Sequence, residues 1–177
     1  MPGGGLGLVA AGFVVGSVHT SRQAATFVGA DNGIDMPAYL KRYAEERIPV
    51  GRWLGEHKGA DDFATFGGAG VIPYYSEIPG IDVFGLVDAT IAHDPRTTVS
   101  NRPGHQKWGS DEYLLSRKPT LLTHRYCLGS SCPVESGGAP PGFEWVRAVI
   151  PETGGGTTYY SFMKRRARAF GPFTAMP

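Results

Sequence analysis

Two short polar segments in the middle of the chain carry the residues best suited to holding a polar ligand. Asp82 interrupts the apolar run IDVFGL, and His105 and Lys107 lie in a loop bounded by proline and glycine. A carboxylate, an imidazole and an ammonium group can together hold a sugar hydroxyl and a phosphate. The alternative is that these side chains only fasten the loop to the sheet, because an unpaired buried carboxylate is costly.

A glycine-rich turn and two adjacent tyrosines come before these groups. The segment reads GGAGVIPYYS, and the backbone amides beside Gly70 can approach a phosphate or a sugar closely. Pro73, Tyr74 and Tyr75 follow, and a tyrosine offers its ring face to sugar carbons and its phenol to a hydroxyl. Tight packing of the turn and burial of one tyrosine are the structural alternatives. The spacing is not GxGxxG, so no dinucleotide site is predicted.

The chain contains no recognised catalytic set. Ser76 has no GxSxG context, and His57, His93 and His124 lack a metal-ligand spacing such as HExxH. We therefore assign no catalytic residue, metal or cofactor. A small hydrolase that uses Asp82 and His105 as acid and base is a rival function, and a non-catalytic structural cap is another.

Cys127 and Cys132 flank a short loop with a glycine and two serines. Such a loop can bend enough to join the sulfurs, and the sequence favours a disulfide, which indicates an oxidising compartment. Zinc binding needs four ligands, and only His124 lies close by. Two free thiols are the remaining alternative.

Composition limits the architecture to one modest domain. The chain has 177 residues, with 26 glycines and 14 prolines, and its 17 basic and 16 acidic side chains leave a net charge of +1. So small a charge argues against a general nucleic-acid binder. Three Trp, eight Tyr and nine Phe supply enough apolar area for a folded core.

Alternating strand and helix signals predict an α/β fold, a small three-layer sheet with mainly parallel core strands. A helix is expected over Met36–Lys58, either kinked near Ile48 by Pro49 or divided there. Ser110 is expected to cap a further short helix. Parallel strands are predicted at Phe63–Phe66, Ile81–Phe84 and Thr120–Thr123, with the Ile81 strand extending as far as Leu86. FEWVRAVI and TTYYSFMK predict a C-terminal antiparallel hairpin.

The two ends of the chain differ in character from its middle. Residues 3–18 are uncharged and apolar, and residues 1–20 are interpreted as the remnant of a transmembrane helix. An uncleaved signal segment and a buried N-terminal segment are the alternatives. Residues 36–165 are expected to form the single α/β domain. Residues 166–177 form a basic tail and C-terminus, and the run KRRAR is either a lipid-phosphate contact or a solvated end.

The order of motifs over about residues 40–125 resembles the soluble C-terminal region of bacterial membrane glycosyltransferases of the GT-C superfamily, arabinofuranosyltransferase-like proteins in particular. The matching pieces come in sequence: Trp-Leu, Pro-Tyr-Tyr-Ser after a glycine turn, Ile-Asp with Gly-Leu, Gly-His-x-Lys, and Tyr-Leu-Leu followed by proline. In this chain they stand at Trp53–Leu54, Pro73–Ser76, Ile81–Leu86, Gly104–Lys107 and Tyr113–Pro119.

The resemblance implies an accessory or substrate-binding domain on the periplasmic side of the bacterial inner membrane. Its implied ligand is a lipid-linked sugar or glycan acceptor, and its implied partner is a membrane-embedded transferase domain. The resemblance also implies that the catalytic carboxylate lies in an extracytoplasmic loop near the start of a long multispanning domain. This chain contains no such domain. The chain is therefore expected to bind its ligand without turnover, through Gly70, Pro73, Tyr74, Tyr75, Asp82, His105 and Lys107.

Overall fold

The chain divides into two units, residues 1–45 and 46–177. The computed structural model describes residues 4–26, 30–31, 34–35, 37–96, 104–132, 138–151, 155–169, 171 and 173–175. The first unit contains helix α1 (Gly4–Thr26), the antiparallel strands β1 (Ala30–Asp31) and β2 (Ile34–Asp35), and the start of helix α2 (Pro37–His57). Among the described residues, no helix combines the length and apolar character that a membrane span requires.

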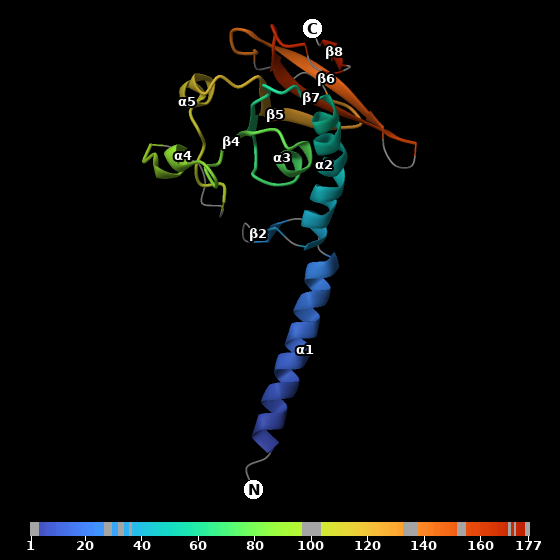
Figure 1. Ribbon diagram of the computed structural model, residues 1–177. Coiled ribbons are helices and arrows are strands. Elements are labelled where there is room, and N and C mark those ends of the chain that lie inside the picture. Colours follow the sequence, from blue (N-terminus) through green and yellow to red (C-terminus); the bar gives the residue numbers. More distant parts are fainter. Residues whose placement is uncertain are drawn as a thin grey trace. The chain divides into compact units, whose positions relative to one another are not determined.

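The second unit is built on a six-stranded mixed sheet of order β4-β3-β5-β7-β6-β8 (Figure 1). Strand β3 lies between β4 and β5 and pairs with both in parallel. Strands β6 and β7 form the predicted hairpin. The strands are β3 (Ala64–Phe66), β4 (Gly80–Asp82), β5 (Leu121–Gly129), β6 (Phe143–Pro151), β7 (Thr157–Arg165) and β8 (Phe173–Ala175).

The main core lies between one face of this sheet and the helices α2 and α3 (Val71–Ser76). Trp53 and Leu54 of α2 pack there with Phe66 and Phe162 of the sheet. Gly51 is needed for this packing, because a Cβ at that position would lie 2.7 Å from Cβ of Tyr75 in α3. Any side chain at position 51 would therefore push α3 away from α2.

Two short helices, α4 (Ala89–His93) and α5 (Asp111–Ser116), contribute to the opposite side of the sheet (Figure 1). Ile91 of α4 and Leu114 of α5 cluster with Ile81. The Ser110 side chain accepts a hydrogen bond from the Tyr113 amide, which is the predicted cap of α5. Helices on both faces make the second unit the small α/β domain that the sequence predicts.

Charged side chains near the C-terminus attach to the body of the second unit. The Arg168 Nε donates to Asp62 over 2.8 Å, and Lys164 forms an ion pair with Glu144. Arg165 Nε donates to the carbonyl oxygen of Pro119 at 2.7 Å, and Arg166 forms a longer ion pair with Glu144 at 3.7 Å. All four charged members of the KRRAR run therefore have partners within the protein. Strand β8 follows and pairs with β6, a contact that the sequence did not predict.

Several expectations for individual elements need correction. Of the two alternatives for residues 36–58, the structure has one helix, α2, which continues through Pro49, and not two. Strand β4 ends at Asp82, so the predicted continuation to Phe84 and Leu86 is wrong, and those residues form a turn. The predicted loop over residues 98–109 is described only from Gly104 onward, and residues 152–154 of the hairpin connection also lie outside the described residues.

Candidate functional site

The carboxyl ends of β3 and β4 lie side by side, because the two strands pair in parallel. Gly67 follows β3, and the turn Val83–Val87 follows β4. In open α/β sheets, ligands bind beyond this end of the strands. We call this part of the domain, with the loop Gly104–Gly109 and His124 of β5, the carboxyl edge.

Asp82 holds the turn that follows β4. Its Oδ1 accepts a hydrogen bond from the Phe84 amide at 3.1 Å, and its Oδ2 accepts one from the Leu86 amide at 2.6 Å. The residue is only 2% exposed. Both carboxylate oxygens therefore hold the turn in place, which is the structural alternative to ligand binding.

The loop Gly104–Gly109 lies against this turn. The His105 ring meets the Phe84 ring edge-on with centroids 4.4 Å apart, and the Trp108 ring meets the same phenylalanine at 5.2 Å. Lys107 Nζ donates to the carbonyl oxygen of Asp94 at 2.7 Å. The structure thus brings His105 to the carboxyl edge beside two aromatic rings, and it gives Lys107 a fastening contact.

The glycine turn and the tyrosines occupy a separate position. The Gly70 amide donates to the Gly68 carbonyl oxygen at 3.0 Å, so that amide is already used within the turn. Pro73, Tyr74 and Tyr75 lie on α3, which packs against α2, and Tyr74 is exposed. No contact between these tyrosines and Asp82, His105 or Lys107 is found in the described part of the chain. The predicted site residues therefore fall into two groups.

His124 is a site residue that sequence reasoning missed. It lies on β5 just beyond Thr123, the residue paired with Phe66 at the end of β3. Its side chain is 8% exposed, and its Nδ1 lies 2.6 Å from Oγ1 of Thr65. The Trp108 ring meets the imidazole edge-on, with centroids 5.9 Å apart.

The His124 imidazole is uncharged at neutral pH. Burial, with a smaller contribution from the charge of Arg125, lowers the pKa of His124 from 6.5 to about 4. Among the described residues, the Thr65 hydroxyl has no acceptor other than Nδ1. The hydroxyl therefore donates to Nδ1, which places the imidazole proton on Nε2.

Nε2 of His124 is buried and has no hydrogen-bond partner in the described structure. A buried donor without an acceptor is costly, so such an atom calls for an explanation. An oxygen of a bound ligand would satisfy it.

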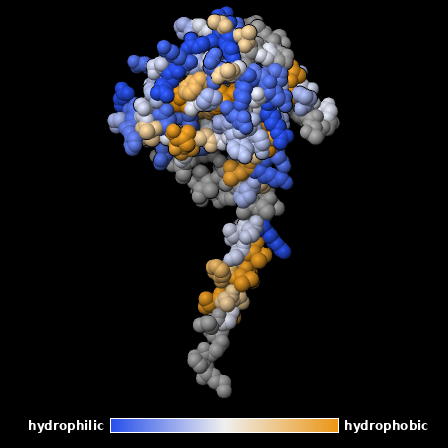
Figure 2. Space-filling view, viewed as in Figure 1, coloured by the Kyte–Doolittle hydropathy of each residue, from blue (hydrophilic) through white to orange (hydrophobic). Residues whose placement is uncertain are grey.

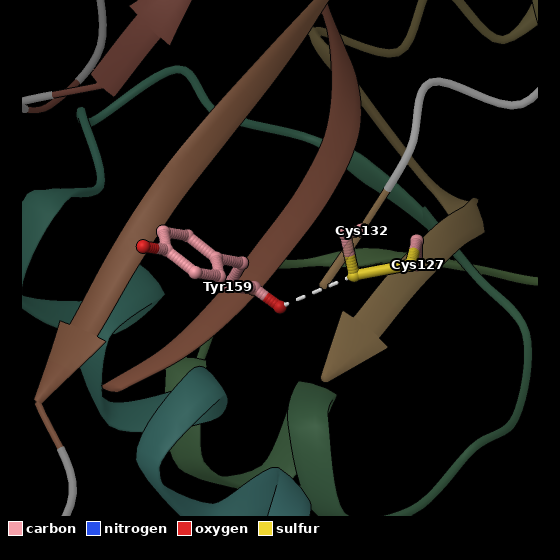
Figure 3. Close-up of a disulfide and its surroundings, with 3 residues drawn as sticks. All are labelled: Cys127, Cys132 and Tyr159. Atoms are coloured by element: carbon pink, nitrogen blue, oxygen red, sulfur yellow. Dashed lines mark hydrogen bonds between the residues drawn. A yellow bond between two sulfur atoms is a disulfide. The ribbon is translucent and has the colours of Figure 1, made fainter. Parts of the chain in front are cut away.

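Cys127 and Cys132 form the predicted disulfide, with Cα atoms 5.5 Å apart (Figure 3). Cys132 Sγ lies 3.6 Å from the carbonyl oxygen of Tyr159 on β7, so the bridge sits against the hairpin. Both cysteines are consumed by the bond. Within the described ranges, no cluster of His, Cys, Asp and Glu is arranged to hold a metal ion.

One family model matches a part of the chain that includes the whole carboxyl edge. Residues 37–163 match the family model described as Domain of unknown function (DUF8728). The chain belongs to the DUF8728 family. No curated protein and no solved structure matches the chain. The DUF8728 match extends from α2 into β7 and includes His105, Trp108, His124 and the disulfide.

The carboxyl edge of the DUF8728 domain presents aromatic and imidazole side chains. It offers half-buried aromatic rings at Phe84 and Trp108, the His105 imidazole, and the single donor of His124. Aromatic rings pack on the apolar faces of sugars, and a neutral imidazole N–H donates to a hydroxyl or phosphate oxygen. The Asp82 carboxylate, which a hydrolase would need, is occupied by the turn.

Proposed function

We propose that this chain is an accessory domain of a cell-envelope glycosyltransferase that uses a polyprenyl-phosphate sugar, and that its carboxyl edge binds the sugar-phosphate end of that ligand. The observation that carries the proposal is the buried, uncharged His124 with an unused donor at Nε2. The order of motifs along the chain, similar to that of GT-C transferases, supports it independently.

The disulfide and helix α1 support the proposed location at the periplasmic side of the inner membrane. A disulfide persists in an oxidising compartment and is rare in the reducing cytoplasm. Helix α1 carries exposed apolar side chains, among them Leu8, Phe13 and Val15 (Figure 2). In this proposal catalysis belongs to a membrane-embedded transferase domain, and the chain alone binds without turnover.

The proposal is tested by titrating the full chain with a farnesyl-phosphate pentose while tryptophan fluorescence is recorded. Trp53 and Trp145 are buried in two other core clusters, whereas Trp108 packs against Phe84 and His124. A fluorescence change on binding should therefore come from Trp108, and a Trp108→Phe variant should lose it. We expect saturable binding and no release of free sugar. Absence of binding would favour a structural cap, and sugar release would favour a hydrolase.

His124→Phe is the variant that tests the assigned donor, because it keeps a ring against Trp108 and removes Nε2. Loss of one buried hydrogen bond should weaken binding about tenfold. His93→Gln is the matched control, since His93 is an exposed histidine on α4. Equal affinity of the His124→Phe variant and the control, with both folded by thermal unfolding, would remove His124 from the site.

A further inference from the structure

Two buried polar atoms without a hydrogen-bond partner belong to residues that face each other in the hairpin of β6 and β7. Arg147 of β6 and Ser161 of β7 are direct partners in the antiparallel register, so their side chains leave the same face of the sheet next to each other. Ser161 is fully buried, and its Oγ has no partner in the described structure. The Nε of Arg147 is buried as well and also has none there. Two neighbouring donors therefore share the need for one acceptor.

The Arg147 guanidinium has a contact on its face and none along its donor edge. Its Cζ lies 4.9 Å from the centroid of the Tyr159 ring, which lies on the same face of β7 as Ser161. Such a contact uses the π face of the ring, whereas the N–H groups of a guanidinium point outward in its own plane. The described part of the chain gives Arg147 no carboxylate partner. The donor edge is therefore available to a ligand.

The immediate neighbours of this pair on the same face of the sheet are uncharged. They lie two positions along either strand, or opposite Ser161 on β5: Trp145, Val149, Tyr159, Met163 and Cys127. Cys127 is in the disulfide and carries no thiol. A partly buried guanidinium without a counter-ion is costly, and one negative charge would balance it. The expected ligand is therefore a singly charged anion.

A carboxylate group matches these donors in charge and in shape. The Nε–H and one terminal N–H of a guanidinium form a planar fork that can bind both oxygens of a carboxylate. The Ser161 hydroxyl can donate to one of the same oxygens. A carboxylate carries one charge and one substituent, whereas a phosphate monoester would bring close to two negative charges to a single cation. The donors of Arg147 and Ser161 therefore favour a carboxylate.

We propose that Arg147 and Ser161 form a binding site for the carboxylate group of a small molecule. The site lies on β6 and β7, two strands that do not form the carboxyl edge, so it does not depend on binding of a sugar phosphate. Both donors are covered in the structure, so the guanidinium turns on the Tyr159 ring to admit the ligand. This movement breaks no hydrogen bond of the guanidinium with the described residues.

The NMR signal of the Arg147 Nε–H group tests this proposal on the full chain. The ¹⁵N-labelled chain is titrated with sodium acetate while sodium chloride keeps the ionic strength constant, and an Arg147→Lys variant assigns the signal by its loss. Arg52 is the matched control in the same spectra. Its Cζ also lies over a tyrosine ring, 5.4 Å from the centroid of Tyr75, but the residue is exposed on α2.

We expect a saturable downfield shift of the Arg147 proton and none at Arg52, because only Arg147 has a buried hydroxyl beside it. No shift at Arg147, or equal shifts at both arginines, would overturn the proposal. An Arg147 proton that is already hydrogen-bonded without acetate, and does not move on titration, would also overturn it and indicate an acceptor within the chain.

Ser161→Ala tests the second donor. This variant should weaken acetate binding about tenfold, whereas Ser116→Ala on α5 should leave it unchanged. The midpoint of urea unfolding should not fall in Ser161→Ala, because without ligand the buried hydroxyl has no hydrogen bond to lose. Native acetate affinity of the folded Ser161→Ala variant, or a clear loss of its stability without acetate, would contradict the assignment of Ser161 to the site.

Discussion

Mild acid should destabilise the second unit through His124. The folded state keeps this imidazole neutral, since burial lowers the pKa of His124 to about 4, whereas the unfolded chain takes up the proton near 6.5. Stability contributed by the neutral imidazole is therefore fully present above about pH 6.5 and is lost as the pH falls toward 4. We compare the loss of stability on acidification between the native chain and the His124→Gln variant.

The size of the effect follows from the two pKa values. Below pH 6.5, protonation of the imidazole stabilises the unfolded state relative to the folded state by about 1.4 kcal/mol per pH unit. The free energy of unfolding therefore falls by about 2 kcal/mol between pH 7 and pH 5. Two carboxylates, Asp94 and Glu144, have lowered pKa values in the folded chain. The pKa of Asp94 is lowered to about 2 by its hydrogen bonds with Arg96, and the pKa of Glu144 is lowered by Lys164.

Urea unfolding at a series of pH values measures this loss. His124→Gln should be less stable than the native chain at pH 7, because the contact with Thr65 changes, but it should lose about 2 kcal/mol less on going to pH 5. His93→Gln, at an exposed histidine of α4, is the matched control for replacing a histidine by glutamine. If His124→Gln and the native chain lose equal stability between pH 7 and pH 5, the claim that the folded chain keeps His124 neutral is wrong.

Three further substitutions test the contacts around the site. Cys127→Ser with Cys132→Ser opens a loop of sequence separation 5 and should cost about 2 kcal/mol by urea unfolding, and intact mass with and without reductant should show the bond in the native chain. Asp82→Ala leaves the turn amides unpaired and should cost about 2 kcal/mol, so a variant of native stability would contradict the fastening role. Lys107→Ala should lower stability by about 1 kcal/mol, because the contact with the Asp94 carbonyl is lost. His105→Ala should weaken ligand binding about tenfold. A destabilised His105→Ala variant with native affinity would remove His105 from the site.

The parts of the fold that were predictable depend on local signals. Ser110 before two acidic residues is a strong helix start, and the alternation of apolar strands with helical segments led to the parallel pairing of β3 with β4 and β5. The strand at Ile81 was extended too far because IDVFGL is apolar throughout. The side chain of Asp82 instead captures the amides of the next residues and turns the chain.

The features that were missed depend on contacts between distant residues. His124 is buried because Thr65 pairs with it across 59 positions and Trp108 packs on it from a loop, and neither contact has a signal within its own segment. Helix α3 was hidden by Pro73 and the preceding glycines, which are typical of a turn. Strand β8 pairs with a strand more than twenty positions earlier in the chain.

The central claim is that the carboxyl edge binds the sugar-phosphate end of a lipid-linked sugar, and mapping of backbone amide NMR shifts tests it most directly. The full chain, labelled with ¹⁵N, is titrated with the farnesyl-phosphate pentose in detergent, and detergent with farnesol alone serves as the reference. The account predicts shifts concentrated at Gly67, Val83–Val87, Gly104–Gly109 and His124, with β6 and β7 unchanged. Shifts confined to other parts of the chain, or none beyond those produced by farnesol, would contradict it.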